Sequence, residues 1–262
     1  MKKILSFLLI FSIAASLVGC SSSDKEEVEK ETICIAAAAS LENAFEEELI
    51  AMFNEEYPNI TVEGTYDSSG KLQEQIEAGL EADVFFSAAT KQMDALIEKD
   101  YINTKTRVDL LENKVVLIVS KNSTLDLKTF TDITKASSIA LGDPASVPAG
   151  QYAKETLTNL NLWDEVNAKA SYGTNVTEVL NQVAEGSAEA GIVYATDAAS
   201  MTDKVKVIAE APADSLATPV VYPVATLKSS KHADSAKAFV EFLKSDKAVK
   251  VFEKYGFTKN QK

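Results

Sequence analysis

The chain has 262 residues, of which 39 are acidic, 26 are basic and one is a histidine, and its formal net charge is −13. This acidic balance argues against nucleic acid or an anionic membrane surface as a partner, because both repel a negatively charged protein. The length is enough for one large domain or for two modest ones.

The N-terminus has the layout of a secretion signal. Two lysines precede an apolar stretch over residues 4–18, which is short for a membrane span. The stretch ends in "LVGC", which resembles a bacterial lipobox, so we expect a signal peptide over residues 1–19 and a lipid on Cys20. A plain membrane anchor and an ordinary signal with an incidental cysteine are the alternatives. Residues 20–31 then form a flexible tether at the outer face of the cytoplasmic membrane.

The second cysteine, Cys34, follows the tether. With Cys20 lipidated, Cys34 has no partner for a disulfide, and we expect it to be a small buried hydrophobe in the first strand. Cleavage would also remove Lys2 and Lys3, which changes the formal charge from −13 to −15.

Beyond the tether, strand-like and helical patterns alternate. The expected strands cover residues 32–37, 59–65, 83–87, 114–119, 138–141, 190–193, 205–209 and 219–225. The expected helices cover residues 40–56, 70–79, 90–98, 150–160, 175–185, 194–200, 233–244 and 246–254. This alternation predicts an α/β protein with largely parallel sheets.

Two strongly apolar strands suggest a division into two lobes. "KVVLIVS" at residues 114–120 follows a polar stretch, and "TPVVYPVA" at residues 218–225 precedes the C-terminal helices. If both strands cross between lobes, residues 32–112 plus 224–262 form one lobe, and residues 113–223 form the other. A cleft between two such lobes is a common place for a small ligand.

The usual signatures of catalysis are missing from the sequence. It contains no G-x-S-x-G elbow, no HExxH motif, no Cys/His cluster, no GxxxxGK[ST] loop and no GxGxxG. The single histidine, His232, lies in a lysine-flanked helix start that looks exposed, so a serine nucleophile would lack a base. We therefore expect a binding protein without a cofactor rather than an enzyme, with a carboxylate-pair hydrolase as the alternative.

Four strand-to-helix junctions carry small polar residues. In "AAAASLENAF" an alanine run leads to Ser40, which we expect to cap a helix. The segments "TYDSSGKL", "GDPASVPAGQYAKE" and "YGTNVTEVL" repeat this layout, and "GIVY" ends at Tyr194. Each junction is also explained by an ordinary loop and cap. Together they offer helix N-termini on both lobes, and such N-termini bind anions.

Several of these segments resemble the molybdate-binding proteins of bacterial ABC uptake systems. The segments are "AAAASLENAF", "SSGKLQEQIEAGLEADVFFSA", "GDPASVPAGQYAKE", "GIVYATDA" and "VFEKYGF", and they keep their order from Thr32 to Phe257. The resemblance implies a two-lobed periplasmic-binding-protein fold, type II-like, with two crossover strands. It also implies a monomer that captures molybdate or tungstate and delivers the ion to an ABC permease with its ATPase.

Carried over by motif position, the resemblance implies five ligands of the oxyanion, namely Ser40, Ser69, Ala149, Val176 and Tyr194. The two serines would give hydroxyl and backbone N–H donors, Ala149 and Val176 a backbone N–H each, and Tyr194 its phenol. Ser68 stays open as the alternative to Ser69. Molybdenum would be held only as the oxyanion, through these residues.

Neutral donors can hold a dianion if enough of them converge, since a hydrogen bond to a charged group contributes roughly 1.5–3 kcal/mol. Such a site has no acceptor for the proton of hydrogen phosphate. The alternatives are the same fold binding another tetrahedral oxyanion such as sulfate, a hydrolase using Ser40 or Ser69, and a surface lipoprotein without a ligand.

Overall fold

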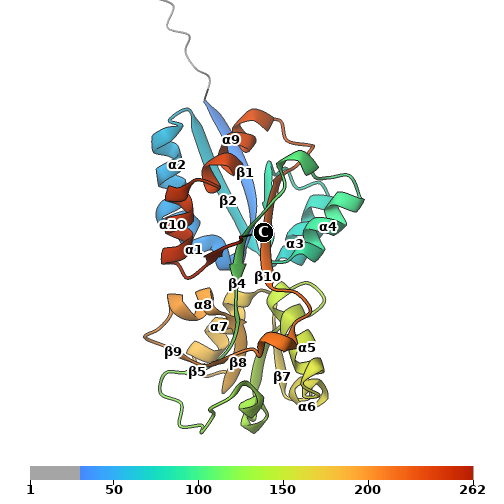
Figure 1. Cartoon of the computed structure of the whole chain (residues 1–262), viewed down its shortest axis with the longest axis vertical. Coiled ribbons are helices and arrows are strands. Elements are labelled where there is room, and N and C mark those ends of the chain that lie inside the picture. The colour runs from blue at the N-terminus through green and yellow to red at the C-terminus, as the bar shows by residue number, and fades with distance from the viewer. Residues whose placement is uncertain (1–29, 262) are drawn as a thin grey trace, which may run out of the picture.

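The computed structural model describes residues 30–261, which form two β-sheets covered by helices (Figure 1). The predicted signal peptide, Cys20 and most of the predicted tether lie outside these residues. Glu31, placed in the tether by the sequence, is the first residue of strand β1 and pairs with Ile60. Among the described residues, no helix combines the length and apolar character that crossing a membrane requires.

The first sheet has six strands in the order β11-β4-β10-β3-β1-β2. The strands are β1 (Glu31–Ala38), β2 (Ile60–Asp67), β3 (Val84–Phe86), β4 (Val108–Asn113), β10 (Val220–Thr226) and β11 (Thr258–Lys259). Helices α3 (Ser69–Glu77) and α4 (Thr90–Glu98) lie on one face of this sheet. The other face carries the helix after β1 together with α9 (Ala233–Leu243) and α10 (Asp246–Lys254) (Figure 1).

The helix after β1 is irregular. It begins as the 3-10 turn η1 (Ala39–Leu41), continues through α1 (Glu42–Ala44) and the π turn η2 (Phe45–Leu49), and ends as α2 (Ile50–Glu56). Ser40 lies inside its first turn, so the prediction that Ser40 is the N-cap is wrong. The N-cap is Ala38, and no side chain in the described part of the chain caps this end of the helix.

The second sheet has five strands in the order β7-β6-β8-β5-β9. The strands are β5 (Val115–Ser120), β6 (Ile139–Gly142), β7 (Ala170–Gly173), β8 (Ala190–Tyr194) and β9 (Val205–Glu210). The helices of this part are α5 (Pro148–Asn159), α6 (Trp163–Asn167), α7 (Val176–Ala184) and α8 (Ala195–Ser200). Pro148 occupies the first turn of α5, where its missing N–H costs nothing.

Both sheets are mixed rather than largely parallel. Strands β2, β1 and β3 are parallel to one another in the first sheet, as are β7, β6 and β8 in the second. The strands next to the connections between the sheets, β4 and β10 in the first and β5 and β9 in the second, pair antiparallel. The sequence pattern shows that a strand is buried, but it does not show the direction of its neighbour.

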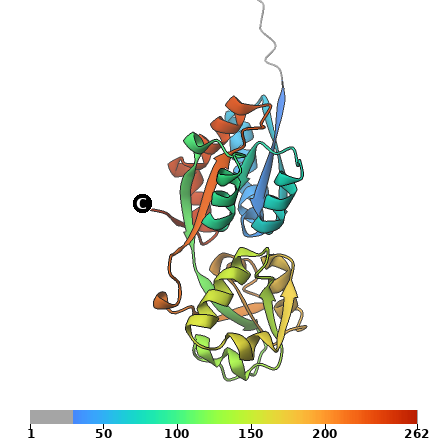
Figure 2. The same cartoon turned by 90° about the vertical axis from the view of Figure 1, so that its right-hand side faces the viewer.

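Two connections join the sheets (Figure 2). Lys114 alone separates β4 in the first sheet from β5 in the second. Residues 211–219, which include the 3-10 turn η5 (Ala213–Ser215), lead back from β9 to β10. Because Val220 already pairs with β4, the return to the first sheet is complete before residue 224, where the sequence placed it.

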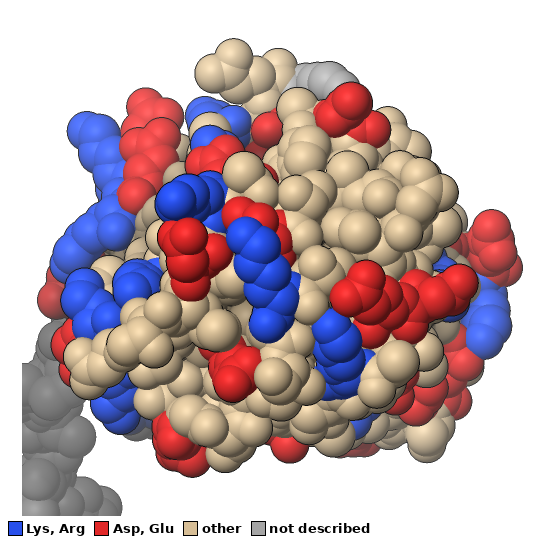
Figure 3. Space-filling model, turned by 90° about the horizontal axis from the view of Figure 1, so that it is seen from below, with Lys and Arg blue, Asp and Glu red and all other residues tan. Residues whose placement is uncertain are grey.

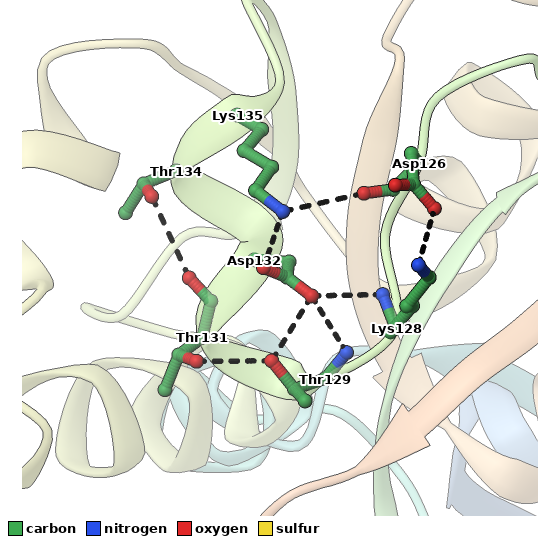
Figure 4. Close-up of polar contacts among 7 residues, drawn as sticks. All are labelled: Asp126, Lys128, Thr129, Thr131, Asp132, Thr134 and Lys135. Carbon is green, nitrogen blue, oxygen red and sulfur yellow. Dashed lines mark hydrogen bonds and ion pairs between the residues drawn. The ribbon is translucent and has the colours of Figure 1, made fainter.

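Several short elements were not predicted, namely β4, β7, α6, β11 and the 3-10 turns η3 (Thr104–Thr106), η4 (Phe130–Lys135) and η5. Figure 4 shows how η4 is held. The Asp132 carboxylate accepts hydrogen bonds from the backbone N–H groups of Lys128 (2.8 Å) and Thr129 (2.9 Å), and it pairs with Lys135 (2.7 Å). These contacts lower the pKa of Asp132, so the charged carboxylate stabilises the turn.

Many charged side chains on the surface lie beside a side chain of opposite charge. Figure 3 shows one end of the molecule, where lysines lie beside aspartates and glutamates. Just after α6, for example, the Lys169 ammonium lies 3.1 Å from the carboxylate of Glu165, four residues earlier in the chain. This pairing is typical of a solvated surface, and each such pair contributes little to stability.

Phe45 lies at the centre of the aromatic core of the first sheet. Its ring contacts four others at centroid distances of 5.9–6.4 Å, namely those of Tyr66, Phe86, Phe239 and Phe252. Its side chain is fully buried, and it therefore joins the helix after β1 to both C-terminal helices.

We expect Phe45→Ala to lower the free energy of unfolding by about 3–5 kcal/mol, because the lost burial is added to the cost of a cavity. Chemical denaturation without ligand measures this change. Val207→Ala, at a side chain that is 48% exposed, is the control and should stay within about 0.5 kcal/mol of the wild type. Equal losses for the two variants would contradict the placement of Phe45.

Candidate oxyanion-binding site

Each sheet with its helices forms one lobe of the molecule, and a small cavity lies between the two lobes. Its lining consists of Ala38, Ala39, Ser40, Asp67, Ser68, Ser69, Ala88, Val147, Pro148, Ala149, Val176 and Tyr194. All five residues predicted as ligands are therefore brought together, and so is the alternative Ser68. The space open to the centre of a water-sized sphere is about 10 Å³, close to the minimum that one water needs.

The cavity is surrounded by the carboxyl ends of strands. Ser40 follows β1, Ser69 follows β2, Val176 follows β7, and Tyr194 is the last residue of β8. Ala149 follows β6 after a short loop. In α/β proteins ligands bind outside the carboxyl ends of the strands, because loops and helix N-termini meet there.

The two serines after β2 have different hydrogen bonds. Ser68 is the N-cap of α3, and its hydroxyl accepts from the Lys71 N–H at 3.4 Å. Ser69 is fully buried, and its hydroxyl accepts from the Ala88 N–H at 2.9 Å. Since a hydroxyl that accepts one bond still has its own hydrogen to give, Ser69 is suited to donate into the cavity.

Ala149 and Val176 bring backbone N–H groups to the cavity. Val176 is the first residue of α7, and Ala149 is the second residue of α5. The first N–H groups of a helix have no acceptor within that helix, and they carry its positive partial charge. The small side chain of Ala149 leaves its N–H uncovered.

Tyr194 is the residue of the lining whose surroundings point most directly to an anion as ligand. Its side chain is 1% exposed, and its hydroxyl oxygen is buried without a hydrogen-bond partner among the described residues. A buried hydroxyl without a partner costs about 1–3 kcal/mol. Burial raises the pKa of this phenol well above its usual range, so Tyr194 can only offer an O–H to an anion.

Behind Ser40 lies a chain of polar contacts that the sequence did not predict. The Ser40 hydroxyl is 2.9 Å from the hydroxyl of Tyr222, a fully buried residue of β10. Asn113 Nδ2 donates to the Tyr222 oxygen at 3.2 Å and to Thr196 Oγ1 at 2.9 Å. The only sequence signal of these contacts is Tyr222, a polar group inside an apolar strand, because Asn113 ends a strand that the sequence did not predict.

Among residues 30–261, no lysine, arginine or histidine lines the cavity. Arg107, the one arginine of the chain, is bound to Asp94 (2.5 Å) and Asp109 (3.1 Å). The one acidic group of the lining, Asp67, accepts from the Ser68 N–H at 2.7 Å and faces Lys71. The serines therefore have no histidine as a base, and the donors that face the cavity are neutral.

His232 and Cys34 lie elsewhere, in a pocket beside Asp83. The His232 side chain is 36% exposed and lies 3.6 Å from the carboxylate of Glu31. Cys34 is a free thiol and only half-buried, so the expectation that it is buried is wrong. Burial and the nearby Asp83 raise its pKa. Within residues 30–261, no group of three His, Cys, Asp or Glu side chains could hold a metal ion.

The two lobes touch at the rim of the cavity. The Gly70 N–H donates to the Ser146 carbonyl at 2.9 Å, and Gln92 Nε2 donates to Gln151 Oε1 at 3.2 Å. A Cβ atom at Gly70 would lie 2.3 Å from that carbonyl oxygen. Position 70 thus has to be glycine for the lobes to come this close.

Comparison with known proteins shows that the chain belongs to the bacterial extracellular solute-binding proteins, whose family model matches residues 33–258. It is 43% identical to the putative ABC transporter substrate-binding lipoprotein YvgL of Bacillus subtilis (strain 168), over 98% of each chain. It is 40% identical to the molybdate-binding protein ModA of Escherichia coli (strain K12), over 86% of this chain and 88% of that protein.

A solved structure agrees with these relatives. The substrate-binding domain of a putative molybdenum ABC transporter from Clostridium difficile is 39% identical, with a TM-score of 0.68. The match covers 88% of this chain and 100% of that one. The predicted resemblance to molybdate-binding proteins and the predicted two-lobed fold are therefore confirmed.

We expect Gly70→Ala to weaken ligand binding at least tenfold while the unliganded protein stays folded. Alanine suits the first turn of α3, but its methyl group would clash with the Ser146 backbone when the lobes meet. Calorimetric titration and thermal unfolding measure the two effects. The control is Gln75→Ala at an exposed position of the same helix, and equal affinity of the two variants would contradict the role of this contact.

Asp197, next to the site, predicts a pH dependence of stability. Its carboxylate accepts from the Tyr194 N–H at 3.0 Å, and burial raises its pKa from 3.8 to about 7. The folded state therefore holds a proton that the unfolded state has released. This contribution is complete below pH 4 and is lost, at up to about 1.4 kcal/mol per pH unit, as the pH rises to 7.

In Asp197→Asn the neutral amide keeps the bond to Tyr194 and removes the titration. We expect this variant to gain about 2 kcal/mol relative to the wild type between pH 5 and pH 7. Denaturation at several pH values measures the difference. Asp203→Asn, at an exposed turn, controls for the loss of one charge. Curves for Asp197→Asn and the wild type that run parallel over this range would contradict the assignment.

Proposed function

We propose that the protein captures molybdate or tungstate in the cavity between its lobes and delivers the ion to an ABC permease. The observation that supports this most directly is the buried Tyr194 hydroxyl, which makes no hydrogen bond of good geometry to any of residues 30–261 and lines the cavity together with the other four predicted ligands. The molybdate-binding relatives support the same ligand.

The proposed donors are the hydroxyls of Ser40, Ser69 and Tyr194 and backbone N–H groups of Ser40, Ser69, Ala149 and Val176. Seven hydrogen bonds at roughly 1.5–3 kcal/mol each would offset much of the cost of taking the ion out of water. Three of the N–H groups, those of Ser69, Ala149 and Val176, belong to helix N-termini, which favour an anion further.

The proposed ligands are all donors, and Asp67, the one carboxylate of the lining, is already bonded to the Ser68 N–H and faces Lys71. Such a site also selects among oxyanions. Hydrogen phosphate would bring a proton that finds no acceptor, at a cost of about 1–3 kcal/mol. Sulfate has no such proton, but it is smaller and its oxygens would not reach every donor. Sulfate is therefore the second candidate ligand, and competition distinguishes it from molybdate.

The sequence of the N-terminus suggests where in the cell the protein acts. We infer that the signal peptide is cleaved and that Cys20 carries the lipid, as the name of the lipoprotein YvgL suggests for that relative. Residues 20–30 would then tether a monomer to the outer face of the cytoplasmic membrane. Closure of the two lobes over the ion would make the loaded form the one that docks on the permease.

We expect calorimetric titration of residues 21–262 to show tight binding of molybdate and tungstate and much weaker binding of sulfate. Ser69→Ala should weaken molybdate binding about tenfold or more, because a donor to the ion is lost. Flat traces for molybdate and tungstate would reject the proposed function. Tighter binding of sulfate than of molybdate would identify sulfate as the ligand instead.

Ser68→Ala is the matched control for Ser69→Ala. It removes the same hydroxyl one residue away, where the oxygen caps α3. We expect a loss of about 1 kcal/mol in stability with a smaller change in affinity. The reverse pattern would assign the ligand to Ser68.

A further inference from the structure

The hydrogen bonds that link Asn113, Tyr222 and Ser40 have a defined order of donors and acceptors, and Asn113 sets this order. The Asn113 side-chain oxygen accepts from the Lys114 N–H at 2.8 Å. Because only the amide oxygen can accept, this bond fixes which way the amide points. The Nδ2 hydrogens are then turned toward Tyr222 (3.2 Å) and Thr196 (2.9 Å).

The direction continues through Tyr222. Its oxygen accepts from Asn113, and its single hydrogen is then free to be donated to Ser40 Oγ at 2.9 Å. Both Tyr222 and Asn113 are buried, with exposures of 0% and 8%, so water does not compete for these groups. Burial also raises the pKa of Tyr222, which keeps its hydrogen in place.

We infer that Asn113 and Tyr222 are positioning residues that make Ser40 a hydrogen-bond donor to the bound anion. The inference rests on the proposed function and deepens it. Without Asn113 as a donor, the Ser40 hydroxyl could donate to Tyr222 and present only lone pairs to the ion. With Asn113 in place, Ser40 accepts from Tyr222, and its own hydrogen is left for the cavity that Ser40 lines.

Asn113→Asp tests this by reversing the chain. The carboxylate still accepts from Lys114, and it now also accepts from Tyr222, so Tyr222 turns its oxygen toward Ser40. The Ser40 hydrogen is then taken up by Tyr222. We expect this variant to bind molybdate at least about tenfold more weakly than the wild type.

The double variant Asn113→Asp with Tyr222→Phe separates this effect from the added charge. It keeps the carboxylate but removes the hydroxyl that captures the Ser40 hydrogen. We expect molybdate binding to recover at least about threefold over Asn113→Asp alone, a rescue that damage to packing would not give. Binding equal to or weaker than that of Asn113→Asp would overturn the inference.

Tyr222→Phe and Ser40→Ala give a second measurement, which does not depend on the charged variant folding. If Tyr222 acts through Ser40, Tyr222→Phe weakens molybdate binding no more than Ser40→Ala does, and it adds nothing in the Ser40→Ala background. Independent losses would overturn the inference. Tyr101→Phe is the control for loss of a tyrosine hydroxyl, because it removes one that donates to the Glu77 carbonyl and does not contact Ser40.

All variants are titrated with molybdate beside the wild type, and thermal unfolding without ligand confirms that each is folded. A wild type that does not bind molybdate rejects the proposed function, and the inference falls with it. A wild type that binds, with Tyr222→Phe and Asn113→Asp binding equally well, overturns the inference alone.

Discussion

Hydrogen bonds from fixed neutral groups are the interaction on which the proposed oxyanion site depends. A dianion leaves water at a large cost, and that cost is offset only where many donors meet at one point. In both sheets the carboxyl ends of strands face the same cavity. Three alanines with small side chains, Ala38, Ala39 and Ala88, are part of its lining. Since the proposed donors are backbone groups, two serine hydroxyls and one buried phenol, their positions are set by the fold.

Much of this arrangement could be predicted from local sequence. A strand, a small polar residue and an amphipathic helix follow one another at β1 and again at β2, and that layout needs only neighbouring residues to be recognised. Five residues from segments far apart in the chain lie on one cavity, as the family resemblance implied. Their role as ligands stays a prediction.

What could not be predicted depends on contacts between distant residues. Ser40 has the sequence context of an N-cap, but its hydroxyl is bound to Tyr222, 182 residues away, and the helix begins before it. β4 carries two acidic residues and β7 is short, so neither shows the pattern of a buried strand. Their pairing with distant strands, rather than their own composition, makes them part of the sheets.

The unequal connections between the sheets define how the molecule can open. Strands β4 and β5 are both hydrogen-bonded in their sheets up to Lys114, so this path cannot lengthen, and a relative rotation of the lobes has its pivot there. Residues 211–219 form the longer path and must bend to follow. Asn113 adjoins this pivot, whereas Gly70 and Ser146 meet at the rim. A small rotation of one lobe relative to the other therefore moves Asn113 very little, because Asn113 lies close to the pivot. The same rotation moves Gly70 and Ser146 apart by more, because they lie farther from the pivot.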